Sequence, residues 1–94
     1  MDQINQLIQK NSRRADYYVV RAEMEMNRKA YESAEIDYKK AIELEPGNVI
    51  YYLNRASYYI KTGQKDKARQ DLKKASSLNA DPGELAALYE ELEN

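Results

Sequence analysis

Apolar side chains recur along this chain at the three- and four-residue spacing of amphipathic helices. Residues 1–10 carry such a stripe, formed by Ile4, Leu7 and Ile8. This stripe predicts a short helix. Near the other end, Asp81 is a good helix N-cap and Pro82 suits the first helical position, so a last helix is expected from there. Its apolar stripe consists of Leu85, Leu88, Tyr89 and Leu92. Both ends of the chain are therefore expected to be helical.

Between these ends one pattern occurs twice, 34 residues apart. The segment that starts at Tyr17 recurs from Tyr51 without a gap. Small residues that allow helices to approach closely recur in both copies, as Ala22, Ala34 and Ala41 and then as Ala56, Ala68 and Ala75. A repeat of this period predicts helix pairs that bury their apolar faces against their neighbours. The four helices are expected near 15–28, 31–44, 49–62 and 65–78.

The recurring residues resemble the tetratricopeptide repeat. Large side chains lie between the alanines, namely Tyr18, Tyr38 and Leu44, then Tyr52, Leu72 and Leu78, and Pro46 closes the first unit. The sequence departs from the family pattern at Arg21 and Arg55 in place of leucine, Glu25 in place of the first tyrosine, and Ala80 in place of the second proline. The resemblance implies an all-α fold, a helix-turn-helix superhelix (α–α solenoid) of about six helices.

The resemblance also implies a single domain over residues 1–94. Residues 1–14 are expected to be the second half of a preceding repeat, or a cap that mimics it, because Ile4 falls on the slot of Tyr38. The expected divisions after it are repeat one at 15–48, repeat two at 49–82 and a capping helix at 83–94. A docking helix for a partner is the alternative for the last segment.

Composition favours binding over catalysis. The chain has no His and no Cys, which excludes Ser–His and Cys–His nucleophiles and the usual nitrogen and sulfur ligands of zinc. We therefore expect no enzyme activity, no catalytic residue, no metal site and no cofactor. The chain lacks a long apolar run and a signal peptide and is expected to be soluble, without membrane insertion, and its compartment stays open.

Charge gives no indication of a nucleic-acid partner. One third of the residues are charged, but the formal net charge is only −1. The basic pairs Lys39–Lys40 and Lys73–Lys74 recur at the repeat period, with acidic residues interleaved. They are expected to form a solvated face rather than a ridge that binds phosphates.

Two features recur within each unit. Arg21 lies sixteen residues before Asp37, and Arg55 lies sixteen residues before Asp71, so each arginine on a first helix is predicted to form an ion pair with an aspartate on the second. A ligand-binding role for the arginines is the alternative. Lys29 occupies the slot of Gly63, a residue that follows a helix and favours positive φ, so Lys29 is a candidate for left-handed backbone.

In the family, the first helix of each unit lines a concave groove. The equivalent positions here, expected to bind a partner, are Val19, Glu23, Met26, Ile50, Leu53, Asn54, Ser57 and Ile60. Several are apolar, and exposed apolar patches mark interaction sites. The resemblance thus implies a non-catalytic scaffold that binds a peptide or helix of a protein partner in this groove. The alternative is a self-association module, a homo-oligomer that stacks or dimerises through its exposed repeat ends or its groove.

One subfamily grips the C-terminal carboxylate of chaperone peptides. Its first contributing unit supplies a lysine and an asparagine, where this chain has Val19 and Glu23. The carboxylate clamp is therefore not assembled here, and Glu23 would repel a carboxylate ligand.

Overall fold

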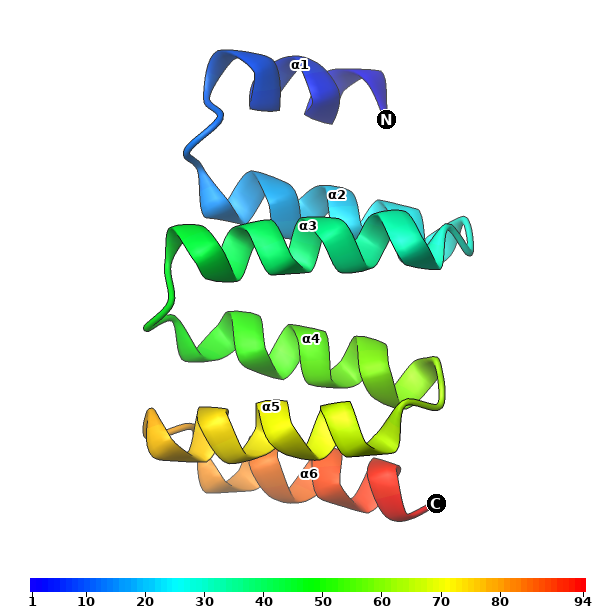
Figure 1. Ribbon diagram of the computed structural model, residues 1–94, viewed down its shortest axis with the longest axis vertical. Coiled ribbons are helices and arrows are strands. Elements are labelled where there is room, and N and C mark those ends of the chain that lie inside the picture. Colours follow the sequence, from blue (N-terminus) through cyan, green and yellow to red (C-terminus); the bar gives the residue numbers. More distant parts are fainter. The chain divides into compact units, whose positions relative to one another are not determined.

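Six helices joined by short turns make up the fold, and the computed structural model describes all residues from 1 to 94 (Figure 1). The helices are α1 (Asp2–Lys10), α2 (Ala15–Asn27), α3 (Tyr31–Leu44), α4 (Val49–Lys61), α5 (Lys65–Ser77) and α6 (Pro82–Glu93). The all-α prediction is confirmed, and the helices lie close to their expected positions. None of them combines the length and apolar character that a bilayer-crossing helix needs.

The chain divides into two compact units, Met1–Pro46 and Gly47–Asn94. Each unit contains one of the two repeated helix pairs, α2–α3 or α4–α5, together with one of the terminal helices. The assignment of the terminal segments as caps or half-repeats stays a prediction.

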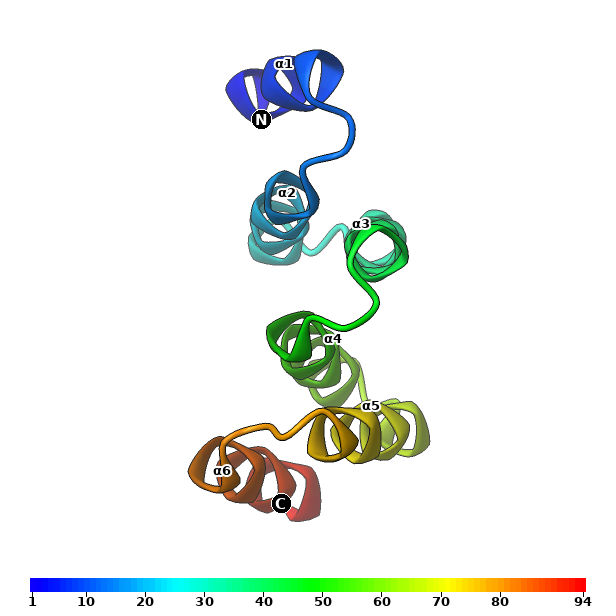
Figure 2. The same ribbon diagram turned by 90° about the vertical axis from the view of Figure 1, so that its left-hand side faces the viewer.

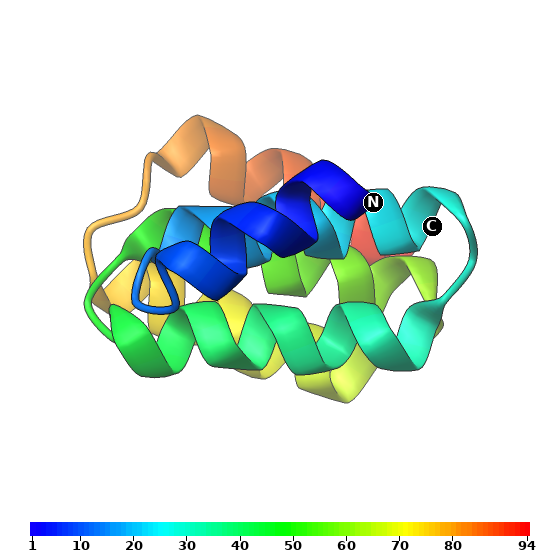
Figure 3. The ribbon, with the colours of Figure 1, turned by 90° about the horizontal axis from the view of Figure 1, so that it is seen from above.

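The first unit is a hairpin of α2 and α3 with α1 packed against α2 (Figure 3). Ala22 on α2 and Ala34 and Ala41 on α3 are fully buried, because only small side chains fit where the two helices approach each other. Buried Ile4 and Ile8 anchor α1. The predicted role of the small residues therefore agrees with their burial, whereas Leu7, the third residue of the N-terminal apolar stripe, is 42% exposed.

The second unit is a hairpin of α4 and α5 on which α6 packs, in contact with both helices (Figure 2). Ala56, Ala68 and Ala75 are fully buried, like their counterparts in the first unit. Leu72 of α5 and Leu92 of α6 are the largest fully buried side chains of the chain. The last helix is therefore a packed element of this unit and contributes to its core.

Three helices end in the same motif. Lys29, Gly63 and Asn79 have positive φ angles of 61°, 77° and 66°. In each case the amide of the next residue donates to the carbonyl five residues earlier, as from Ala30 to Glu25 at 2.8 Å. This is the Schellman arrangement, which satisfies carbonyl groups left open at a helix end. The left-handed backbone predicted at Lys29 is confirmed, whereas the same conformation at Asn79 was not predicted.

Side-chain caps fix the beginnings of two helices. Asn48 accepts a hydrogen bond from the Ile50 amide at 3.0 Å, at the start of α4. Asp81 accepts one from the Glu84 amide at 3.0 Å, at the start of α6, with Pro82 in the first turn. The predicted N-cap at Asp81 is thus confirmed.

Candidate functional site

Each hairpin is closed by a bidentate arginine–aspartate pair. In the first, Arg21 Nε and Nη2 lie 2.8 Å from the two carboxylate oxygens of Asp37. In the second, the same two atoms of Arg55 lie 2.8 Å from those of Asp71. Both aspartates are buried, and both ion pairs predicted from the sixteen-residue spacing are present. The hydrogen bonds to the aspartates raise the pKa of both arginines above the ordinary value.

The two guanidinium groups are engaged on other sides as well. Arg21 Nη1 donates to Asn5 Oδ1 of α1 at 3.0 Å, and its Cζ lies 5.7 Å from the centre of the Tyr18 ring. The Arg55 Cζ lies 5.7 Å from the ring centre of Tyr59. These contacts, all within one unit, favour a structural role for the arginines over ligand binding.

A buried carboxyl group distinguishes the first hairpin. Glu25 lies on the inner side of α2, its Oε1 has no hydrogen-bond partner, and its Oε2 is 4.0 Å from Arg21 Nε. Burial, and second the adjacent carboxyl group of Asp37, raise the pKa of Glu25 from 4.5 to about 8. The equivalent position of the second hairpin is Tyr59. The sequence marked Glu25 as a departure from the family pattern but did not indicate its burial.

The predicted groove residues differ in exposure. On α2, Glu23 is exposed, Met26 is partly exposed and Val19 is buried. On α4, Ile50 and Ser57 are exposed, Asn54 and Ile60 are partly exposed, and Leu53 is buried. The expectation that all apolar members offer exposed surface is therefore wrong for Val19 and Leu53, which are part of the core.

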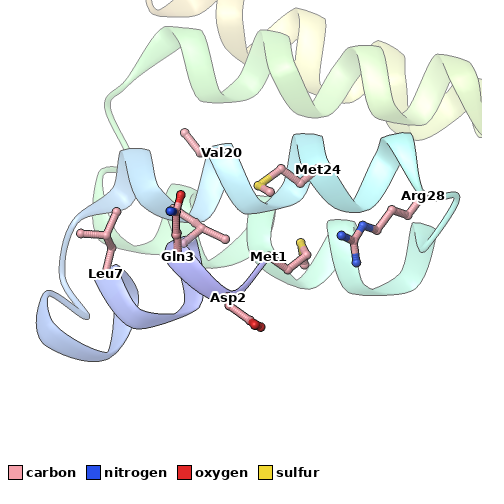
Figure 4. Close-up of a pocket in the computed structure, with 8 residues that line it drawn as sticks. Met1, Asp2, Gln3, Leu7, Val20, Met24 and Arg28 are labelled. Atoms are coloured by element: carbon pink, nitrogen blue, oxygen red, sulfur yellow. The ribbon is translucent and has the colours of Figure 1, made fainter.

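A hollow that the sequence analysis did not identify lies between α1 and α2 (Figure 4). This α1–α2 cavity has a volume of about 580 Å³ and is lined by Met1, Asp2, Gln3, Ile4, Leu7, Val20, Met24 and Arg28. Leu7 and Val20 leave 42% and 46% of their surface exposed. The sequence contained one indication of exposed apolar surface here, because Val20 occupies the slot that holds the polar Asn54 in the second unit.

The acidic side chains do not assemble a metal site. No group of three or more Asp, Glu, His or Cys side chains has a geometry that could hold a metal ion. The carboxylates that lie close together, Glu25 and Asp37, are accounted for by the core of the first hairpin.

Comparison with known proteins agrees with the repeat architecture. Two tetratricopeptide repeat profiles match, one over residues 15–48 and one over residues 37–70. The chain is 43% identical over 54 residues to small glutamine-rich tetratricopeptide repeat-containing protein 2 of Mycosarcoma maydis. The matched stretch covers 57% of this chain and 15% of that protein. It is also 44% identical over 50 residues to serine/threonine-protein phosphatase 5 of Mus musculus. This matched stretch covers 53% of the chain and 10% of that protein.

The chain therefore spans only a small part of the length of each of these relatives, 15% and 10%. The two profiles together span residues 15–70, which contain the complete α2–α3 hairpin, α4 and the first part of α5. With the duplicated helix pairs, the buried alanines and the repeated ion pairs, these matches show that the chain belongs to the tetratricopeptide repeat family.

Proposed function

We propose that this chain is a non-catalytic protein-interaction module, and that a peptide or helix of a partner protein binds the faces of α2 and α4 that the family resemblance assigns to its concave groove. Membership in the family supports a role as a scaffold for protein interactions. The absence of His and Cys from the sequence supports the non-catalytic part of the proposal.

The observation that carries the proposal is Ile50. This side chain is 57% exposed at the start of α4. Asn54 and Ser57 follow on the same helical face, so one apolar anchor lies beside groups that donate and accept hydrogen bonds. Such a mixture is typical of sites where a few polar groups orient an apolar ligand. Covering the exposed part of Ile50 would contribute roughly 1–2 kcal/mol to binding.

The face of α2 complements this description. Glu23 is exposed and Met26 is partly exposed, and Met adapts to ligands of different shape because its side chain is flexible. Val19 and Leu53 are buried and are not proposed to touch the partner. The proposed contacts are therefore Glu23, Met26, Ile50, Asn54, Ser57 and Ile60.

A photoreactive amino acid at position 50, introduced into the protein in its native cells, tests the proposal without knowledge of the partner. The matched control is position 36, because Ile36 is also an exposed apolar residue, on α3, and is not among the proposed contacts. Irradiation should yield a discrete adduct with another protein from position 50 and none from position 36. An adduct between two copies of the chain would instead support self-association, and equal labelling at both positions would contradict a specific site.

A further inference from the structure

Arg21 connects all three helices of the first unit. The residue belongs to α2, and its Nε and Nη2 donate hydrogen bonds to Asp37 of α3. Its third nitrogen, Nη1, donates to Asn5 Oδ1 of α1 at 3.0 Å. The position of this one guanidinium group therefore affects both the closure of the hairpin and the packing of α1 against it.

Glu25 places a second carboxyl group beside the same guanidinium. Its Oε2 lies 4.0 Å from Arg21 Nε, which is too far for a hydrogen bond, and its Oε1 is buried without a partner. The charged groups that act on this carboxyl are Asp37 of α3 and Arg21 of α2, while α1 presents the uncharged Asn5 to the cluster. One guanidinium thus faces two carboxyl groups and is hydrogen-bonded to one of them.

The neutral form of Glu25 suits this arrangement. As an acid it can donate its proton to Asp37, and Asp37 then keeps its negative charge and its pair with Arg21. As a carboxylate it would leave a charged oxygen buried without a partner, which is costly. Burial, followed by the hydrogen bond with Asp37, accordingly raises the pKa of Glu25 to about 8.

Ionisation of Glu25 changes the demands on Arg21. Two carboxylates then compete for one guanidinium, and the hydrogen bond to Glu25 forms only if the two groups move closer than the present 4.0 Å. The guanidinium is planar and rigid, so turning its Nε toward Glu25 also displaces Nη1. The hydrogen bond to Asn5 is the one that this turn removes from α1.

The first unit can yield most easily at α1. The hairpin of α2 and α3 is closely packed on the fully buried Ala22, Ala34 and Ala41. By contrast, α1 has nine residues and is anchored by the buried Ile4 and Ile8. A helix of this length is only marginally stable without packing, and weakly held elements open before the rest of a fold.

We propose that Glu25 and Arg21 form a proton-controlled latch on α1. With Glu25 neutral, Arg21 bonds both Asp37 and Asn5, and α1 stays docked on the hairpin. With Glu25 ionised, Arg21 turns toward it and leaves Asn5, and α1 separates from α2 and loses its helical structure. This inference concerns the interior of the first unit and does not depend on the function proposed for the faces of α2 and α4.

The direction of the response follows from the raised pKa of Glu25. The proton is held on the acid side, so α1 is docked below about pH 8 and is released as the pH rises through that value. Because Tyr59 occupies the equivalent slot of the second unit, the hairpin of α4 and α5 has no such latch.

Carbon-detected NMR of the uniformly ¹³C-labelled chain, titrated from about pH 6 to about pH 9, tests the latch. The Cδ shift of Glu25 reports its ionisation, and the Cα shifts of Ile4 and Ile8 report the helical structure of α1. The Cδ shift should titrate with a midpoint near pH 8. The two Cα shifts should lose at least about half of their helical displacement with the same midpoint, while that of Leu72 on α5 stays constant.

Three variants separate the latch from a general effect of pH. Glu25→Gln carries an amide that can donate to Asp37 as the neutral acid does but cannot ionise, so α1 should stay helical over the whole range. Glu23→Gln, a matched change at an exposed position of the same helix, should keep the response of the unaltered chain. Asn5→Ala removes the acceptor on α1 and should lower the helical shifts of α1 already at about pH 6.

The proposal is overturned if Glu25 does not titrate in this range, or if it titrates while Ile4 and Ile8 keep their helical shifts. It is also overturned if α1 responds to pH in Glu25→Gln as it does in the unaltered chain. Shifts and a pH response in Asn5→Ala that match those of the unaltered chain would show that Asn5 does not hold α1, and would equally overturn it.

Discussion

The two hairpins, α2–α3 and α4–α5, have the same ion pair at the same distances but different surroundings for it. In the second hairpin, Tyr59 packs edge-on against Tyr58, with ring centres 5.2 Å apart, and its ring faces Arg55. In the first, Glu25 occupies the equivalent slot, and one of its buried oxygens has no hydrogen-bond partner. The same ion pair thus fits beside either side chain, and we expect the slot of Glu25 and Tyr59 to make the two hairpins differ in stability and in their response to pH.

The largest expected effect comes from removing an aspartate. Asp71→Ala leaves a largely buried guanidinium without its partner and should lower the free energy of unfolding by about 2–4 kcal/mol. Asp37→Ala should cost less, about 1–3 kcal/mol, because Glu25 lies 4.0 Å from Arg21 and can replace the lost carboxylate. Urea denaturation of both variants measures the difference. Equal losses would show that Glu25 does not act as a substitute partner.

The next prediction exchanges Glu25 and Tyr59, the equivalent residues at which the two hairpins differ. Glu25→Tyr gives the first hairpin the side chain of the second and removes a buried, incompletely bonded carboxyl group. We expect stabilisation by about 1–2 kcal/mol at pH 8, measured by urea denaturation. Tyr59→Glu is the reciprocal control and should destabilise the chain. A loss of stability in Glu25→Tyr would mean that the space around Glu25 does not admit an aromatic ring.

The raised pKa of Glu25 predicts a pH dependence of stability. The folded state holds the proton of Glu25 up to about pH 8, whereas the unfolded state releases it near the ordinary value of 4.5. The folded state therefore binds more protons between these values, so this group makes stability fall as pH rises from about 5 to about 8. Glu25→Gln should flatten that part of the stability profile. An unchanged slope in the variant would assign the pH dependence to other groups.

The smallest expected change in stability concerns the turns that follow α2 and α4, the first helix of each hairpin. Lys29→Gly removes the strain of a left-handed Lys and should be neutral or stabilise by up to about 1 kcal/mol, since greater unfolded-state entropy offsets part of the gain. Gly63→Ala should cost about 1 kcal/mol through backbone strain alone, because a Cβ there would meet no atom within 4 Å. Thermal melts of both variants give the comparison. A clear loss in Lys29→Gly would indicate a side-chain contact of Lys29 that stabilises the turn.

Local patterns in the sequence predicted the parts of the fold that depend on near neighbours. Helix periodicity, the Asp81 cap and the left-handed turn at Lys29 follow from spacing and residue type. The two ion pairs were also predictable, because the repeat places Arg21 and Asp37 in the same relation as Arg55 and Asp71. An arginine that recurs on the first helix of each pair needs an oppositely charged partner when the helix pair buries it, and the aspartate that recurs on the second helix supplies one.

How far particular side chains are covered by neighbouring helices was not predicted. Val19 and Leu53 have the spacing of groove residues, but spacing alone does not determine how much of a side chain its neighbours cover. The burial of Glu25 and the α1–α2 cavity depend in the same way on how closely α1, α2 and α3 pack. Asn79 was missed because Asn adopts positive φ less regularly than Gly, so residue type alone gave a weak signal.

We propose that Ile50, an exposed apolar residue on α4, serves to bind another protein rather than a second copy of the chain. The most direct test is the mass of the purified chain in solution at two concentrations about a hundredfold apart. The account predicts the single-chain mass of 11.0 kDa at both. A mass that doubles at the higher concentration, and returns to the single-chain value in Ile50→Asp, would contradict it.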